Sequence, residues 1–145
     1  FLSNYVTAAS GLIDVDRGLL RLSLAGHPPP MIVRADGEVT TVEHGQIPLG
    51  IEADTEYGTV DLPFGPGDLL LLYTDGIIEA AAPDRSRYGL GLLKQALLAS
   101  RGLSAAEVVE YVRQDLRRHC GPAALDDDMA MLAVRRPPAE ADFRL

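Results

Sequence analysis

The stretch that decides the fold is Gly67-Asp-Leu-Leu-Leu-Leu-Tyr-Thr-Asp-Gly-Ile-Ile-Glu-Ala80. Its centre, residues 69–73, is a short, continuously apolar run between turn-forming segments, which is typical of a strand buried on both faces. Asp75 follows this run closely, and Gly76 allows another part of the backbone to approach. The stretch therefore predicts a buried strand with a carboxylate at its end.

The residues before this strand predict further strands. Apolar patterns between turn signals place them at 10–15, 19–24, 31–34, 38–42 and 57–62. Asp36-Gly37 is a strong signal for a two-residue hairpin turn. Residues 25–30 read Ala-Gly-His-Pro-Pro-Pro, and the prolines predict an extended loop because they cannot donate hydrogen bonds to a β-ladder.

The residues after it predict two helices and a last strand. The first helix has apolar residues at helical spacing and stops at Arg101-Gly102. The second begins at the capping box Ser104-Ala-Ala-Glu107 and ends at Gly121-Pro122. Its apolar stripe consists of Val108, Val109, Val112 and Leu116. A strand at 129–134 completes the order, which is that of an α+β fold.

Composition narrows the class of protein. The chain has 145 residues, 47% of them hydrophobic, and a formal net charge of −8, which favours one acidic globular domain. A nucleic-acid or anionic-membrane binder would need a basic face, so neither partner is expected. The longest strongly apolar run is far short of the roughly 20 residues of a membrane span. The single cysteine, Cys120, excludes an intrachain disulfide and favours a reducing, cytoplasmic location.

Two acidic segments adjoin apolar strands. Asp75 follows one, and Asp126-Asp127-Asp128 precedes another. Crowded carboxylates at the ends of buried strands are costly unless a cation or solvent compensates them, and their hard oxygens suit Mg²⁺ or Mn²⁺. The alternative is that Asp75 starts a turn and the triplet is a solvated loop. Spacing alone leaves both interpretations open.

Other polar residues carry weaker signals. His27, in the Pro-rich loop, is interpreted as a structural rather than a catalytic histidine. His119 and Cys120 lie at a helix end with nothing in the sequence to activate the thiol. Asp14 and Asp16 do not have the glycine spacing of a calcium loop and are interpreted as a turn.

Taken together, the segments resemble the SpoIIE-type branch of the PPM (PP2C-like) metal-dependent serine/threonine phosphatases, bacterial enzymes that regulate sigma factors. The resemblance covers residues 1–136 and leaves 137–145 as a C-terminal tail. It is carried by the order of the stretches Tyr5-Val-Thr-Ala8 running into Gly11-Leu-Ile-Asp14, 25–30, Pro48-Leu-Gly50, 67–80 and Asp126-Asp-Asp-Met-Ala-Met-Leu132.

The resemblance implies a β-sandwich flanked by helices, with two Mn²⁺ or Mg²⁺ ions between the sheets of the complete domain. It implies that Asp75 and Asp127 are metal ligands, with Asp128 at the position where other branches carry Asn. No catalytic residue beyond the metal ligands is implied. The implied reaction is hydrolysis of phosphoserine or phosphothreonine on a STAS-type anti-sigma-factor antagonist.

The family also carries two acidic motifs ahead of the equivalent of Phe1, and this sequence has neither. We therefore expect the C-terminal two-thirds of a domain, truncated at its N-terminus and with little activity alone. Two carboxylates supply only part of the roughly six oxygens that each ion needs. The alternative is an inactive module with a binding or regulatory role. Because the missing strands would expose sheet edges, we expect a homodimer or strand-exchanged assembly.

Overall fold

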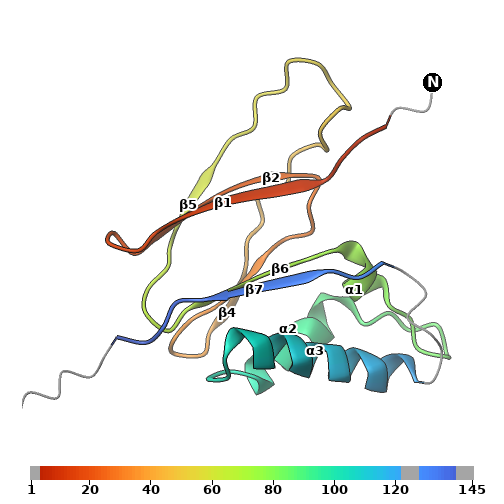
Figure 1. Cartoon of the computed structure of the whole chain (residues 1–145). Coiled ribbons are helices and arrows are strands. Elements are labelled where there is room, and N and C mark those ends of the chain that lie inside the picture. Colours follow the sequence, from red (N-terminus) through yellow and green to blue (C-terminus); the bar gives the residue numbers. More distant parts are fainter. Residues whose placement is uncertain (1–3, 122–127, 140–145) are drawn as a thin grey trace, which may run out of the picture.

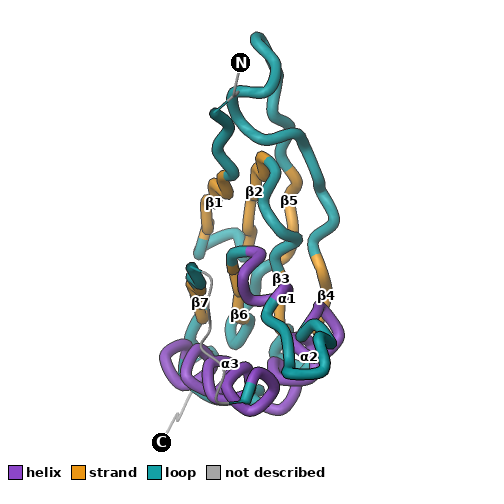
Figure 2. Tube along the Cα trace, turned by 90° about the vertical axis from the view of Figure 1, so that its right-hand side faces the viewer, coloured by secondary structure: helices purple, strands orange, loops and turns teal. Residues whose placement is uncertain are grey.

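Two antiparallel sheets and a layer of helices are stacked in the computed structural model, which describes residues 4–121 and 128–139 (Figures 1 and 2). The first sheet has the order β1-β2-β5 and the second the order β4-β3-β6-β7. The strands are β1 (Ala8–Asp14), β2 (Leu19–Ala25), β3 (Met31–Val33), β4 (Val39–Thr41), β5 (Val60–Pro63), β6 (Leu69–Tyr73) and β7 (Met131–Arg135). The predicted α+β class is confirmed.

Strand β6 is buried on both faces, as its sequence predicts. Leu69, Leu71 and Tyr73 belong to the apolar cluster between the second sheet and the helices. Leu70 belongs to the cluster between the two sheets, together with Leu20, Leu22, Ile32, Val42 and Phe64. Alternate side chains of one strand thus join two cores, which fixes the order of the layers.

The helices cover the second sheet on the face away from the first. The two predicted helices are α2 (Gly89–Ala99) and α3 (Ala105–Cys120), which lie below that sheet in Figure 1. A short helix that the sequence analysis does not predict, α1 (Asp75–Glu79), lies at the end of β6. The predicted capping box is confirmed, since the Ser104 hydroxyl accepts from the Glu107 amide and the Glu107 carboxylate accepts from the Ser104 amide. No helix in the described part of the chain is long and apolar enough to cross a membrane.

Three strands begin two or three residues away from their predicted starts, and the limits of β2, β3 and β4 differ by one residue from the prediction. Strand β1 begins at Ala8 rather than at residue 10, because its pairing with β2 extends to Ala25. Strand β5 begins at Val60 rather than at residue 57, because Gly58 is hydrogen bonded to the side chains of Gln46 and Ser23. Strand β7 begins at Met131 rather than at residue 129, because Ala130 pairs with Thr74 beyond the ladder. At the starts of β5 and β7, hydrogen bonds from side chains replace the regular strand pairing, and an apolar sequence pattern does not reveal such bonds.

The outer face of the first sheet has no helix over it in the described ranges (Figure 1). Leu12 in β1 is paired with Arg21 in β2 and is 62% exposed. Arg21 forms an exposed cross-strand ion pair with Asp61 in β5. The described chain is therefore a sandwich with helices on one side, whereas the family resemblance implies helices flanking the sandwich.

Candidate active site

A cleft of about 240 Å³ lies at one end of the sandwich, between the two sheets. The first sheet supplies Thr7 and Gly26, at the start of β1 and the end of β2. The second sheet supplies Thr74 and Asp75, where β6 leads into α1. The remaining lining residues are His27, Pro28, Pro29 and Ile78. The carboxylate singled out in the sequence thus lies in a cleft formed by both sheets.

Thr74 joins the two acidic segments at this end. Its amide donates to the Ala130 carbonyl at 3.0 Å, and its hydroxyl oxygen accepts from the Ala130 amide at 3.0 Å. The same hydroxyl is 3.5 Å from the Asp128 carbonyl oxygen. These bonds extend the pairing of β6 with β7 and place the backbone of Asp128 beside that of Asp75.

Gly76 lets these segments approach closely. It is buried, and a Cβ atom at this position would lie 2.9 Å from the Asp128 carbonyl oxygen, which is too close for any side chain. The predicted close backbone approach is therefore confirmed, and the segment that approaches is the acidic one.

The Pro-rich loop forms the opposite wall of the cleft. The buried Tyr73 hydroxyl donates to the Pro29 carbonyl at 2.7 Å, which ties the loop to the end of β6. Burial raises the pKa of Tyr73 to about 12, so this hydroxyl remains a donor at neutral pH. The His27 Nδ1 atom lies 2.7 Å from the Pro28 carbonyl oxygen.

Two further segments support this loop. Gly26 has a φ of 62°, and a Cβ there would lie 2.5 Å from Cγ of Pro48. The next residue, Leu49, exchanges two backbone hydrogen bonds with Val6. The motifs around residues 5–8, 25–30, 48–50, 74–76 and 128, which are far apart in the sequence, therefore meet at one end of the molecule.

Asp75 is exposed, and its Oδ1 atom accepts from the Gly76 amide at 3.0 Å. Asp128 is also exposed, whereas Asp127 lies outside the described residues. The carboxylates of Asp75 and Asp128 have the oxygen chemistry that Mg²⁺ or Mn²⁺ requires. Within residues 4–121 and 128–139, no three acidic, histidine or cysteine side chains form a metal-binding group. The carboxylate oxygens of the described residues are ligands of the type that such an ion prefers, but they supply only part of its coordination shell.

Thr74 carries no signal in the sequence, and His27, which the sequence indicates as a structural histidine, lines the same cleft. His27 and Thr74 also line a second, adjoining hollow of about 190 Å³ beside β7. The pairing of β6 with β7 reveals the position of Thr74, and the bond from Tyr73 to the Pro-rich loop reveals that of His27. Cys120, by contrast, is buried in the helix-side core, and burial raises the pKa of its thiol, which disfavours the reactive thiolate form.

Residues 2–137 match the family model described as Stage II sporulation protein E (SpoIIE). The chain belongs to the SpoIIE family. Among curated relatives, Protein IcfG of Synechocystis is 27% identical over 93% of this chain and 21% of its own length. Phosphoserine phosphatase RsbP of Bacillus subtilis is 33% identical over 63% of this chain and 22% of its own length.

Solved structures of SpoIIE-like domains share the fold. The SiaA PP2C domain of Pseudomonas aeruginosa superposes with a TM-score of 0.78 at 22% identity, covering 89% of this chain and 51% of that one. The SpoIIE phosphatase domain of Bacillus subtilis gives 0.73 at 22% identity, covering 96% and 62%. The chain thus spans about a fifth of the curated relatives and little more than half of these PP2C-like domains.

Proposed function

We propose that this chain is part of a metal-dependent protein serine/threonine phosphatase of the PPM class. The observation that carries the proposal is the convergence of five separated motifs around Asp75 at the end of the sandwich. Membership of the SpoIIE family supports the same reaction class, because the relative RsbP is a phosphoserine phosphatase.

In the proposed site, Asp75 and Asp127 would hold Mn²⁺ or Mg²⁺, and Asp128 would stand beside them. When bound, such ions lower the pKa of a coordinated water and neutralise phosphoryl charge during in-line attack. Structures of relatives include a manganese-soaked SpoIIE domain and RsbX in complex with magnesium. The chain's own contribution is to hold Asp75 exposed, with one oxygen bonded to the Gly76 amide, in a cleft bounded by a rigid loop.

The test is Mn²⁺-dependent hydrolysis of p-nitrophenyl phosphate by this chain and by a polypeptide extended upstream. We expect little turnover from the chain alone and robust turnover from the longer one. Asp75→Asn and Asp127→Asn should each abolish it, whereas Asp16→Asn, in the exposed β1–β2 turn, should not. Activity that survives both site substitutions would disprove the ligand assignment.

A second candidate function is a noncatalytic binding or regulatory module. It is favoured by one observation, the lack of a three-ligand metal group among the described residues. The assay separates the two candidates, because a regulatory module would remain inactive in the extended polypeptide as well.

We further propose a phosphorylated STAS-type anti-sigma-factor antagonist as the substrate and the cytoplasm as the location. The relatives RsbP and the RsbU domain of a Mycobacterium tuberculosis protein support this choice of substrate. The buried free thiol of Cys120 suits a reducing compartment. The substrate is tested by incubating a phosphorylated STAS domain with the extended polypeptide and measuring the loss of phosphoserine by mass spectrometry. Retention of the phosphate while p-nitrophenyl phosphate is hydrolysed would contradict this substrate and leave the reaction class intact.

A further inference from the structure

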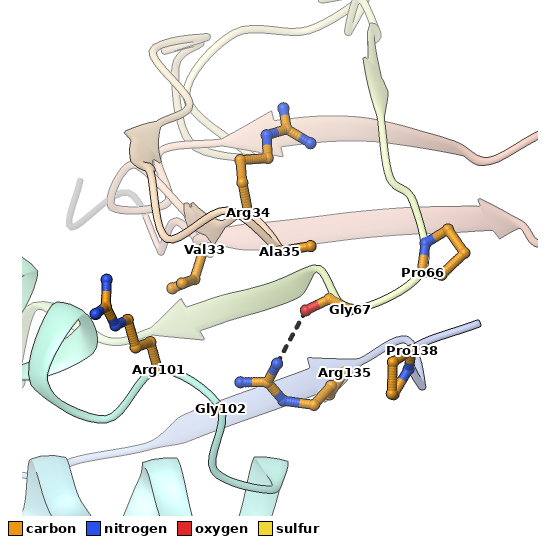
Figure 3. Close-up of a pocket in the computed structure, with 9 residues that line it drawn as sticks. All are labelled: Val33, Arg34, Ala35, Pro66, Gly67, Arg101, Gly102, Arg135 and Pro138. Atoms are coloured by element: carbon orange, nitrogen blue, oxygen red, sulfur yellow. Dashed lines mark hydrogen bonds between the residues drawn. The ribbon is translucent and has the colours of Figure 1, made fainter. Parts of the chain in front are cut away.

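We propose that the arginine pocket, a hollow lined by Arg101, Arg135, Pro66, Pro138 and Val33, binds the phosphate group of a small organic phosphate. This hollow has a volume of about 460 Å³ and lies between the β3–β4 hairpin, the turn before β6, the α2–α3 loop and the end of β7 (Figure 3). The inference does not depend on the proposed function.

Arg135 supplies a partly buried cation to this pocket. Its Nη1 atom donates to the Gly67 carbonyl at 2.9 Å, which holds the guanidinium across the turn before β6 (Figure 3). Its Nε atom is buried and has no hydrogen-bond partner among the residues that the structure describes. A buried N–H without an acceptor is costly, so the Arg135 guanidinium is left with an unsatisfied donor, and a small turn of this side chain toward a ligand oxygen in the hollow would satisfy it.

Arg101 supplies the second cation from the α2–α3 loop. Its side chain lies against the β3–β4 turn, where a Cβ at Gly37 would be 3.1 Å from Nη1 of Arg101. Within the described residues, neither Arg101 nor Arg135 forms an ion pair with a carboxylate. Arg34, which also lines the pocket, is different because it is paired with Asp68 at 3.1 Å. Two uncompensated cations therefore line one hollow of a chain whose net charge is −8.

The chemistry favours a phosphate monoester. Guanidinium groups bind phosphate oxygens through charge-assisted hydrogen bonds, and two cations match a phosphate dianion better than a single carboxylate. Figure 3 shows the two guanidinium groups apart, so the exposed Arg101 side chain would turn toward Arg135 when the ligand binds. The volume is within the range of small-molecule sites and exceeds what a phosphate ion fills. Pro66, Pro138 and Val33 give the remaining wall an apolar character suited to the organic part of the ligand.

The arginine pocket is separate from the candidate active site. Gly67 precedes β6 and Asp75 follows it, while Arg135 ends β7 and Asp128 precedes it. Because Leu69 pairs with Arg135 and Tyr73 pairs with Met131, the two sites lie at opposite ends of the same strand pair. At ~3.3 Å per residue, a five-residue strand separates them by about 15 Å.

Calorimetric titration of this chain with AMP in EDTA tests the proposal, with inorganic phosphate, adenosine and succinate as comparison ligands at constant ionic strength. We expect AMP to bind, phosphate to compete with it, and adenosine and succinate to bind at least about tenfold more weakly. Arg101→Gln and Arg135→Gln should each weaken AMP binding at least about tenfold. Arg117→Gln, an exposed position on α3, is the matched control and should leave the affinity unchanged.

Three outcomes would overturn the arginine pocket as a phosphate site. They are no AMP binding, equal binding by the pocket variants and the Arg117→Gln control, and succinate binding as tight as that of AMP. Loss of binding in Asp75→Asn would place the phosphate in the other cleft, which also overturns it while leaving the proposed function intact. If Arg135→Gln does not fold, Arg101→Gln in the exposed loop decides the result.

Discussion

Thr74, Asp75 and Gly76 are consecutive residues with three different roles at the end of β6. Thr74 forms hydrogen bonds with the segment that precedes β7, Asp75 presents a carboxylate to the cleft, and Gly76 makes room for the Asp128 carbonyl. The sequence predicted the roles of Asp75 and Gly76 from their place after an apolar run. It could not predict that of Thr74, because its partner Ala130 is 56 residues away.

Gly76→Ala should destabilise the fold. The added Cβ would lie 2.9 Å from a backbone oxygen, which must move, and we expect a loss of about 1–3 kcal/mol in the free energy of unfolding measured in urea. Gly91→Ala is the control, because in the described ranges no atom beyond its own helical turn lies within 4 Å of an added Cβ, and helix α2 should be stabilised by up to about 1 kcal/mol. Wild-type stability in Gly76→Ala would show that the acidic segment is not packed against this glycine.

Because Tyr73 is buried, the free energy of unfolding should fall as the pH rises into the alkaline range. The pKa of Tyr73 has the ordinary value of 10.0 in the unfolded chain and is raised by burial to about 12 in the folded one. The stability that the neutral Tyr73 hydroxyl contributes is therefore fully present below pH 10 and is lost as the pH rises toward 12. We expect Tyr73→Phe to show a shallower fall in urea stability over this window. At neutral pH the variant should lose about 1 kcal/mol, because the Pro29 carbonyl loses its donor.

The exposed Tyr5→Phe is the control for Tyr73→Phe and should retain the wild-type pH dependence. Tyr88, whose pKa is raised by burial and by its hydrogen bond to Asp115, should supply the alkaline dependence that remains in Tyr73→Phe. The same slope in Tyr73→Phe as in the wild type would contradict the assignment.

Among the helices and strands, the N-terminal cap of α3 is the clearest case in which neighbouring residues fix where an element begins. Ser104→Ala removes the acceptor for the Glu107 amide and should cost about 1 kcal/mol of stability. The measurement is the midpoint of thermal unfolding, with Ser10→Ala on the exposed part of β1 as the control. An unchanged midpoint in Ser104→Ala would mean that the cap does not stabilise the helix.

The elements that sequence predicted well are those fixed by their own residues. Strand β6 begins and ends where its apolar run does, and α3 begins directly after its capping serine. The β3–β4 hairpin also follows from Asp36-Gly37, where Gly37 has a φ of 95°. The limits of β5 and β7 were predicted less well, because side-chain bonds from Gln46 and Thr74 replace the ladder there.

For the whole molecule, the bare outer face of the first sheet has a consequence for assembly. Leu12 and Val15 are more than half exposed on or beside β1, which is also an edge strand. We therefore expect the chain to self-associate through this face or by strand exchange. The mass from light scattering should rise with concentration, and Leu12→Lys should lower it. A monodisperse monomer at all concentrations would contradict this expectation.

The convergence of the motifs required the topology of the whole chain. Composition and periodicity predicted the order of the elements, and the family resemblance implied a sandwich with its site between the sheets. Neither could place residues 5–8, 48–50 and 128 beside Asp75, since each contact joins segments distant in sequence. The role of Asp127 remains a prediction, because it lies outside the described residues.

Mn²⁺ binding by this chain, followed through the electron paramagnetic resonance signal of the free ion, tests the claim that both acidic segments serve one cation. We expect weak Mn²⁺ binding by the wild type, which Asp75→Asn and Asp127→Asn each reduce at least about tenfold and which Asp16→Asn leaves unchanged. Mn²⁺ binding that is absent from the wild type, or that survives both site substitutions, would contradict it.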